Sequence, residues 1–221
     1  GGVVELQNAN INFSRYGEVI VYDGGCFSMT GGSMFASYYG TNIRSGGVMS
    51  LSGVEVKNTV TNQGTLESTD CTYSSYIKIS TTTGLSGSNN TFMGECFRLD
   101  GFSGVTGDLL PFLSEDCSDE VYIGFYGNIY TTTISNISDI LPGGYKLVYH
   151  LTVASGHTVT LEEGVSINQQ SLDINVKGTL KAEYAEVADA FFSTTDNAAL
   201  YVGEGGVVEL QNANINFSRY G

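Results

Sequence analysis

Residues 1–17 read GGVVELQNANINFSRYG, and residues 205–221 read the same without a change. The two copies begin 204 residues apart. An identity of this length indicates either a tandem array of near-identical 204-residue units or overlapping ends made by design. We favour the array, because self-similarity at a fixed period is the signature of repeat architectures.

A shorter pattern runs through the repeated stretch, Gly-x-Φ-x-Φ-x-x-small-x-Φ, where Φ is usually apolar. Apolar residues at steps of two follow the period of a β-strand, and the offset before the small residue predicts a turn into another short strand. The pattern begins at Gly2, Gly25, Gly47, Gly64 and Gly178, and again at Gly206. The first four starts are 23, 22 and 17 residues apart, which fits one solenoid turn of three short strands.

Stacked turns of this kind predict a continuous core of inward-pointing side chains. The predicted core residues are Val4, Leu6, Ala9, Ile11, Phe27, Met29, Met34, Met49, Leu51, Val54, Val56, Leu66, Cys71, Leu180, Ala182 and Val187. The starting glycines are expected at the corners, where conformational freedom is needed. The predicted fold class is all-β, a parallel β-helix. A β-sandwich is the alternative, but it gives no reason for a recurring motif of this length.

Composition and charge narrow the functional classes. The chain has 221 residues, 29 glycines, 14 tyrosines and a formal net charge of −14, with 23 acidic and 9 basic side chains. So few scattered cations do not make a surface for nucleic acid or anionic membrane. No apolar run reaches membrane-spanning length, and the first residues lack a signal-peptide pattern. Because the chain does not start with Met, we expect a piece or processed product of a larger protein, with any export signal outside it.

One stretch carries a family resemblance. From Tyr145 it reads YKLVYHLTVASGHTVTLEEGVSINQQSLDINVKGTLKAEYAEVADAFFSTTD, which resembles the opening turns of bacterial surface proteins with right-handed parallel β-helices of the pectin-lyase-like type. The matching positions are Val153, Gly156, Thr158, Val159, Leu161, Gly164, Ile167, Leu172, Val176, Gly178, Leu180, Ala182 and residues 191–193. His157 and Glu163 depart from the usual repeat. The resemblance implies a right-handed β-helix in an extracellular or cell-surface setting, and it says little about activity.

The resemblance also implies a domain organisation. Residues 145–204 are expected to be the opening coils of one β-helix unit, which continue into the repeat at 205–221. Residues 1–117 are then the central and C-terminal coils of a unit. Residues 118–144 are predicted to connect one unit to the next, with Pro142-Gly143-Gly144 as a turn signal.

Residues that could carry chemistry are few. The only dense acidic cluster is Glu115, Asp116, Asp119 and Glu120. A solvated charge run is its simpler interpretation, and calcium binding is the alternative. His150 and His157 have no further ligand at metal-binding spacing, Arg98 and Asp100 suggest a surface ion pair, and no GxSxG elbow or glycine-rich phosphate loop occurs. We therefore expect no catalytic site and no cofactor other than calcium.

The cysteines and the glycosylation sequons leave alternatives open. Cys26, Cys71, Cys96 and Cys117 form no CxxC pair, which argues against a zinc site. Buried free thiols are the favoured interpretation, and a Cys96–Cys117 disulfide is the alternative. The sequons at Asn12, Asn89, Asn136 and Asn216 are either glycosylation sites or chance matches in a chain rich in Asn, Ser and Thr.

The function that these observations favour is a fibre, stalk or filament made of 204-residue β-helices, with copies of the protein as end-to-end partners. Coils rise about 4.8 Å each, so roughly nine coils per unit predict an axial repeat of about 45 Å. An adhesin that binds glycan or a partner surface, through residues 76–117, is the second hypothesis. A polysaccharide lyase or hydrolase, which would need carboxylates gathered on one face, is the third.

Overall fold

The chain folds as an all-β solenoid of about eight turns, built from parallel strands. The structure is a computed structural model that describes residues 1–13, 16–37, 39–115, 117–182, 190–194, 198–211 and 213–216. It confirms the prediction of a parallel β-helix. Contacts divide the chain into two compact units, Gly1–Arg98 with Leu109–Val121, and Leu99–Asp108 with Tyr122–Gly221. We call these unit 1 and unit 2.

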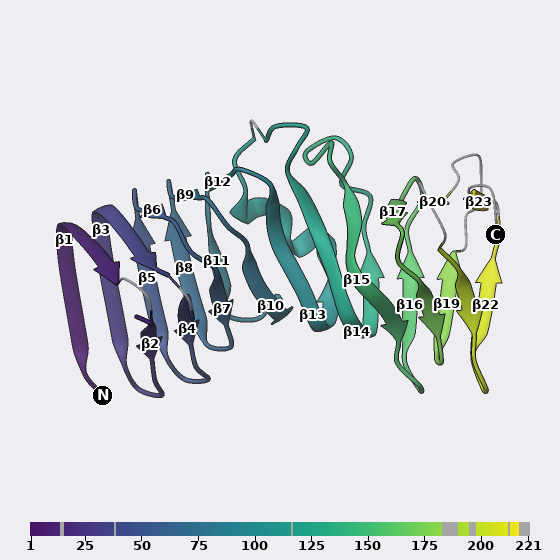
Figure 1. Cartoon of the computed structure of the whole chain (residues 1–221), viewed down its shortest axis with the longest axis horizontal. Coiled ribbons are helices and arrows are strands. Elements are labelled where there is room, and N and C mark those ends of the chain that lie inside the picture. The colour runs from purple at the N-terminus through teal and green to yellow at the C-terminus, as the bar shows by residue number, and fades with distance from the viewer. Residues whose placement is uncertain are drawn as a thin grey trace. The chain divides into compact units, whose positions relative to one another are not determined.

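The strands of unit 1 lie side by side as successive coils (Figure 1). They are β1 (Val3–Phe13), β2 (Val19–Val21), β3 (Cys26–Ala36), β4 (Thr41–Ile43), β5 (Val48–Ser52), β6 (Glu55–Val56), β7 (Val60–Asn62), β8 (Thr65–Thr69), β9 (Thr72–Tyr73), β10 (Ile77–Thr81), β11 (Leu85–Ser88) and β12 (Thr91–Phe92). Strand β13 (Glu95–Val105) and the 3-10 helix η1 (Thr106–Phe112) each contribute residues to both units.

Strand pairing in unit 1 follows the register that the glycine pattern predicts. Val4 pairs with Phe27, Phe27 with Met49, and Met49 with Leu66, all in parallel. These four residues hold the same position after Gly2, Gly25, Gly47 and Gly64. Each start of the pattern therefore begins one coil.

Inward-pointing side chains of adjacent coils form the core of unit 1. Of the predicted core residues in the two units, those that are buried are Phe27, Met29, Met34, Met49, Leu51, Val54, Val56, Leu66, Cys71, Leu180 and Ala182. The first coil departs from the expectation, because Val4 is 48% exposed and Leu6, Ala9 and Ile11 are only half-buried. Within the described residues, β1 has a strand neighbour on one edge only, so nothing covers the other side of these side chains. Val187 lies outside the described residues.

Unit 2 continues the same kind of stacking. Its strands are β14 (Tyr122–Ile134), β15 (Tyr145–Val153), β16 (Thr158–Leu161), β17 (Ser166–Gln170), β18 (Ile174–Val176), β19 (Thr179–Ala182), β20 (Ala190–Thr194), β21 (Leu200–Val202), β22 (Val207–Leu210) and β23 (Ala213–Asn216). Strand β14 pairs in parallel with both β15 and β16. The segment 118–144, expected to be a connection, thus supplies a long strand to the stack.

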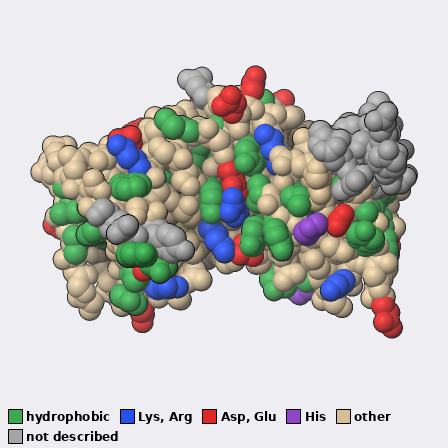
Figure 2. Space-filling view, in the orientation of Figure 1, with side chains coloured by type: hydrophobic (Ala, Val, Ile, Leu, Met, Phe, Trp, Pro, Cys, Tyr) green, Lys and Arg blue, Asp and Glu red, His purple; other side chains and the backbone are tan. Residues whose placement is uncertain are grey.

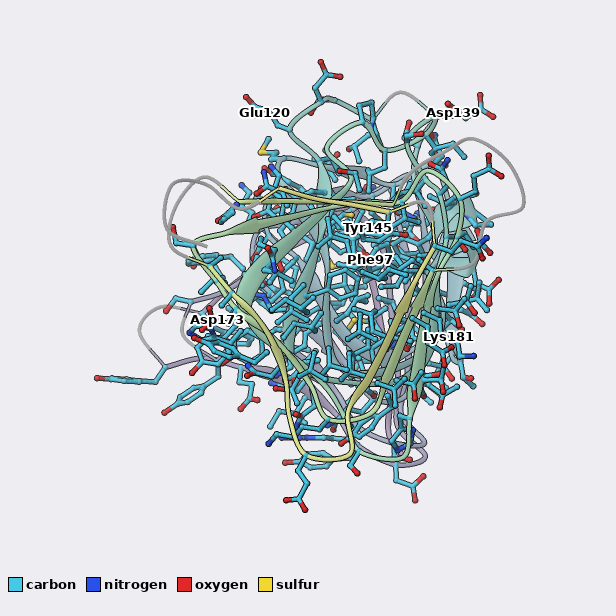
Figure 3. All side chains as sticks on the ribbon, turned by 90° about the vertical axis from the view of Figure 1, so that its right-hand side faces the viewer. Phe97, Glu120, Asp139, Tyr145, Asp173 and Lys181 are labelled. Atoms are coloured by element: carbon cyan, nitrogen blue, oxygen red, sulfur yellow. The ribbon has the colours of Figure 1, made fainter. Side chains whose placement is uncertain are left out.

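Aromatic side chains and satisfied polar groups fill the interior. In unit 1, Tyr73 stacks on Phe92 with ring centroids 4.7 Å apart, and Phe97 meets Phe112 edge to face at 5.6 Å. The buried Asn90 side chain donates to the carbonyls of Ser68 and Phe112, both at 2.8 Å. Figure 3 shows Phe97 inside its unit. Buried amides of this kind satisfy backbone groups that water cannot reach.

The alternation of side chains gives a matched pair of substitutions. Met49 is fully buried, whereas its neighbour Ser50 points outward. We expect Met49→Ala to lower the free energy of unfolding by about 2–5 kcal/mol, because it leaves a cavity. Ser50→Ala removes only an exposed hydrogen bond, from Ser50 Oγ to Glu67 Oε2 at 2.9 Å, and should change it by about 0.5–1 kcal/mol. Urea unfolding followed by circular dichroism measures both, and equal effects would contradict the assigned register.

Candidate assembly interface

Each copy of the repeated stretch lies at the end of a stack of strands. The first copy forms β1, which among the described strands pairs with β3 alone. The second copy forms β22 and β23, which pair with β19 and β20 and with no other strand of the described ranges. Among the described strands, each copy therefore has one paired edge and one unpaired edge.

The two copies use opposite edges. The partner of the first copy, β3, follows it in the sequence, whereas β19 precedes the second copy. Val4 and Val208 are equivalent positions of the repeat. Val4 pairs with Phe27, and Val208 pairs with Leu180. A single coil with this sequence can therefore pair on one edge with a strand like β19 and on the other edge with a strand like β3. The registers would be those seen for Val208 with Leu180 and for Val4 with Phe27.

The same type of corner precedes several coils of the chain, including the coil of the second copy. In the Gly-Gly pairs 24–25, 46–47 and 205–206 the first glycine has a positive φ, +65° at Gly24, +76° at Gly46 and +75° at Gly205. A type II turn requires this conformation at its third residue. The next amide closes the turn, in bonds from Gly25 N to Tyr22 O at 2.9 Å, from Gly47 N to Arg44 O at 2.8 Å, and from Gly206 N to Gly203 O at 2.9 Å. The second copy is thus entered through the same turn as the inner coils.

The glycine that starts several of the coils is required for a different reason, the close approach of the coil before it. A Cβ would lie 2.5 Å from Val21 O at Gly47, 2.4 Å from Arg44 O at Gly64, 2.2 Å from Ala154 O at Gly178 and 2.2 Å from Val176 O at Gly206. At Gly2, the equivalent of Gly206, a Cβ would meet nothing within 4 Å. The same glycine is therefore sterically needed in the second copy and not in the first.

The first and last described coils expose apolar side chains, and an ion pair lies on the outer face of the last coils. In the first copy Val3 is 67% exposed, and beside the second copy Val202 is 52% exposed. Lys181 Nζ lies 2.8 Å from Glu209 Oε2 on the outer face, and Figure 3 shows Lys181 pointing outward. Both side chains are substantially exposed, so the pair contributes little stability. The pair joins β19 to β22 in neighbouring coils.

The acidic cluster does not assemble into a metal site in the part of the chain that is described. Glu115, Asp119 and Glu120 are exposed, and Asp116 lies outside the described residues. No group of three or more His, Cys, Asp or Glu side chains that could hold a metal occurs among the residues with assigned positions. Glu120 points away from its unit in Figure 3. The geometry therefore gives no support to calcium binding by this cluster.

The remaining polar candidates have ordinary structural partners. Arg98 donates to Glu95 at 2.6 and 2.9 Å and to the Tyr76 hydroxyl at 2.7 Å, with its guanidinium 3.7 Å from the centre of the Tyr76 ring. The sequence did not indicate either partner. His150 Nδ1 accepts from the Asp173 amide at 3.0 Å, and His157 Nδ1 lies 3.1 Å from Thr131 Oγ1. These contacts link neighbouring strands.

The four cysteines are free thiols in this structure, so the Cys96–Cys117 disulfide is not formed in it and stays an alternative. Cys71 and Cys96 are buried, Cys117 is half-buried and Cys26 is exposed. Burial raises the pKa of the Cys96 thiol well above its usual value. Because disulfide formation starts from a thiolate, a protonated Cys96 is a poor reactant. The Cys117 thiol donates to Ser114 O at 3.2 Å.

The sequon asparagines differ in what the structure describes of them. Asn12, Asn89 and Asn136 are exposed. The Asn136 Oδ1 accepts from the Ser138 amide at 3.2 Å and from its hydroxyl at 2.9 Å. The side chain of Asn216 lies outside the described part of the chain. Exposure permits modification at the first three and does not show it.

Comparisons of the chain with protein-family models, curated proteins and solved structures find no match. Among the residues with described positions, no helix is long and apolar enough to cross a membrane.

The two equivalent glycines give a direct test of the coil contact. Neither has a positive φ, so alanine is tolerated at both by the backbone itself. Gly206→Ala should destabilise the C-terminal coil by about 1–3 kcal/mol, because its Cβ overlaps Val176 O. Gly2→Ala should change stability by less than about 0.5 kcal/mol. Hydrogen exchange of the amides of residues 207–210, read by mass spectrometry, should rise in the first variant alone; equal exchange in both would contradict the assignment.

Proposed function

We propose that this chain is a structural repeat unit of an extracellular fibre, stalk or filament, built from near-identical 204-residue β-helices in series. The observation that carries the proposal is the identical stretch at 1–17 and 205–221, whose copies are paired on opposite edges. A coil that pairs on one edge as the first copy does and on the other edge as the second copy does would be an inner coil of a longer solenoid. The next unit would then continue the stack without a break.

The physics of a solenoid supports a role in extension. Each coil contacts only its neighbours, so added repeats lengthen the molecule without changing what is already folded. An enzyme gains little from identical copies in series, whereas a stalk gains length from each. We therefore propose a non-catalytic role that needs no cofactor.

Surface charge fits an extracellular structural protein. On the face seen in Figure 2, Lys and Arg side chains lie in small separate groups, without a broad basic patch. The formal net charge of −14 gives neighbouring fibres a mutual repulsion that opposes their lateral aggregation. We propose copies of the protein as its main partners, with no nucleic acid and no membrane insertion.

A second candidate function, adhesion to a glycan, is favoured by aromatic rings on unit 2. Tyr126 stacks on Tyr149 with centroids 4.9 Å apart, and Tyr130 meets the His157 ring at 4.9 Å. Tyr149 is 50% exposed and Tyr130 is 36% exposed. Exposed aromatic faces of this kind bind the apolar faces of sugars. These rings, rather than residues 76–117, are the observation that favours an adhesin.

Adhesion is tested by a glycan array. If the aromatic rings bind sugar, the chain should retain particular glycans and Tyr149→Ala should weaken that binding by about tenfold, the equivalent of about 1.4 kcal/mol. Tyr201→Ala, which removes an exposed tyrosine from a different strand, is the control. Absence of any retained glycan would eliminate this second candidate.

Electron microscopy of native, full-length material tests the fibre. The chain has about eight coils, which at about 4.8 Å each give an axial repeat of the order of 40 Å, close to the 45 Å expected from nine coils. Filaments with this period are the expected result. Discrete single units, or filaments with an unrelated period, would overturn the proposed function.

A further inference from the structure

We propose that Asn136 is the glycan attachment site of this chain, at which its side-chain nitrogen Nδ2 bonds to the anomeric carbon of a sugar. The sequence holds three other sequons, at Asn12, Asn89 and Asn216. The geometry around the side chains favours Asn136 among the four. A glycan at this position goes beyond the proposed function and shares only its extracellular setting, because it would decorate the fibre without entering its core.

Asn136 lies on a surface segment whose backbone is held by buried side chains. The segment, residues 135–144, links β14 to β15, and its residues Ile137 and Leu141 are 3% and 0% exposed. The Leu141 amide donates to Ile137 O at 2.8 Å. Asn136 itself is exposed, and Figure 3 shows Asp139 of the same segment pointing away from its unit. The sequon is therefore presented to solvent on a turn that the core of unit 2 holds in place.

The side-chain amide of Asn136 is prepared for bond formation by Ser138, the hydroxyl residue of the same sequon. Asn136 Oδ1 accepts from the Ser138 hydroxyl at 2.9 Å and from the Ser138 amide at 3.2 Å. The hydrogen bonds of Asn136 use its backbone amide and Oδ1, so Nδ2 donates to no group in the described part of the chain. Loss of a proton from Nδ2 places negative charge on Oδ1, and donors that already point at this oxygen stabilise that charge.

Space for a sugar lies beside this amide. A pocket of about 220 Å³ within unit 2 has among its lining residues Asn136, Ser138, Lys146, Ser166 and Asn168. It is smaller than the pockets that hold drug-sized ligands, and it suits a single sugar ring. Hydroxyl, amide and ammonium groups in its lining are partners for sugar hydroxyls. Gly164 lies against the amide, because a Cβ there would be 2.5 Å from Asn136 Nδ2. The glycine thus leaves the space that the amide occupies.

Asn89 has the same motif and the opposite geometry. Its Nδ2 donates to Asp70 Oδ1 at 2.6 Å, and a hydrogen bond to a carboxylate is one of the stronger kinds. The hydroxyl of its sequon, Thr91 Oγ1, donates to Thr72 Oγ1 at 3.2 Å and not to Asn89. The nitrogen and the hydroxyl that are available at Asn136 are therefore engaged with other residues at Asn89.

The repeated stretch holds the remaining two sequons, Asn12 and its equivalent Asn216. Asn12 lies in β1, where it pairs with Phe35. Strand geometry separates the Cα atoms of residues i and i+2 by about 6.6 Å, so it does not form the tight turn that joins Ser138 to Asn136. The side chain of Asn216 lies outside the described residues. We therefore expect Asn12 to be a poorer acceptor than Asn136.

The modification is the transfer of a sugar from a donor activated by phosphate, either a nucleotide sugar or a lipid-linked sugar. Nδ2 attacks the anomeric carbon, the bond from that carbon to the phosphate oxygen breaks, and the phosphate leaves with the electron pair. A base of the host's glycosyltransferase takes the proton from Nδ2. Because Asn136 occurs once in the 204-residue repeat, the proposed fibre would carry one such glycan per unit.

Peptide mapping of the native protein tests whether the site is used. Trypsin separates the two sequons that differ in geometry, because Lys78, Arg98 and Lys146 bound the peptides 79–98 and 99–146. Mass spectrometry should find the mass of one or more sugar residues added to peptide 99–146, and peptide 79–98 without addition. An unmodified peptide 99–146, or equal modification of both peptides, would overturn the inference.

A second measurement tests whether geometry is the cause of the selection. The purified, folded chain is incubated with an N-glycosyltransferase and nucleotide-activated glucose. Asn136 should be modified about tenfold faster than Asn89, since the Asn89–Asp70 hydrogen bond must break first. Asp70→Ala should raise the rate at Asn89 by about the same factor, whereas Glu115→Ala, which removes a different exposed carboxylate, should leave it unchanged.

Equal rates at the two asparagines of the folded chain, or an Asp70→Ala variant with the Asn89 rate of wild type, would contradict the geometric selection. The isolated tryptic peptides, which have lost the fold, should show no preference, and a preference that persists in them would assign it to the local sequence instead. Native filaments with an unmodified Asn136 would remove this inference alone. Discrete units that carry a glycan at Asn136 would remove the proposed fibre and leave the attachment site standing.

Discussion

Parallel pairing between one coil and the next is the interaction on which the rest of this structure depends. A short strand such as β5 has no partner within its own coil, so its backbone groups are satisfied only by β3 and β8 in the adjacent coils. The same neighbours bury its inward side chains. Met49 on β5 is fully buried, whereas Val4 on β1, with a strand on one edge only in the described chain, is 48% exposed. The stability of a coil is thus set by its neighbours.

The same dependence explains which residues the corners tolerate. The chain must turn within two residues and pass close to the carbonyl of the coil before, as Gly47 passes Val21 O. The first requirement is conformational and belongs to a single coil. The close approach to a carbonyl exists only when another coil is stacked beside the glycine. The glycine pattern in the sequence therefore indicates where coils stack.

Much of the fold could be predicted because the tight turn and the close approach to a carbonyl recur along the sequence. The starts at Gly25, Gly47 and Gly64 and the alternation that follows them gave the correct register. Strand β14 was not recognised, because its sequence YIGFYGNIYTTTI lacks the Gly-Gly start and spans two neighbouring strands. The exposure of Val4 was also missed, since burial depends on a neighbour that alternation does not reveal. For the candidate interface, the identity of its two copies was evident from the sequence, but their pairing on opposite edges required the structure.

An exposed strand edge is a hazard, because unpaired amides and carbonyls template association with other chains. A solenoid of stacked coils has two such edges whatever its length, so an array of many units would carry no more unpaired edge than one unit does. Its buried core, in contrast, would grow with every unit added. Identical junctions are the simplest way to obtain this advantage, since a coil that fits β19 below and β3 above fits at every joint. In the proposed array, this sequence of 17 residues would be an inner coil at every junction, with a β19-type strand on one edge and a β3-type strand on the other.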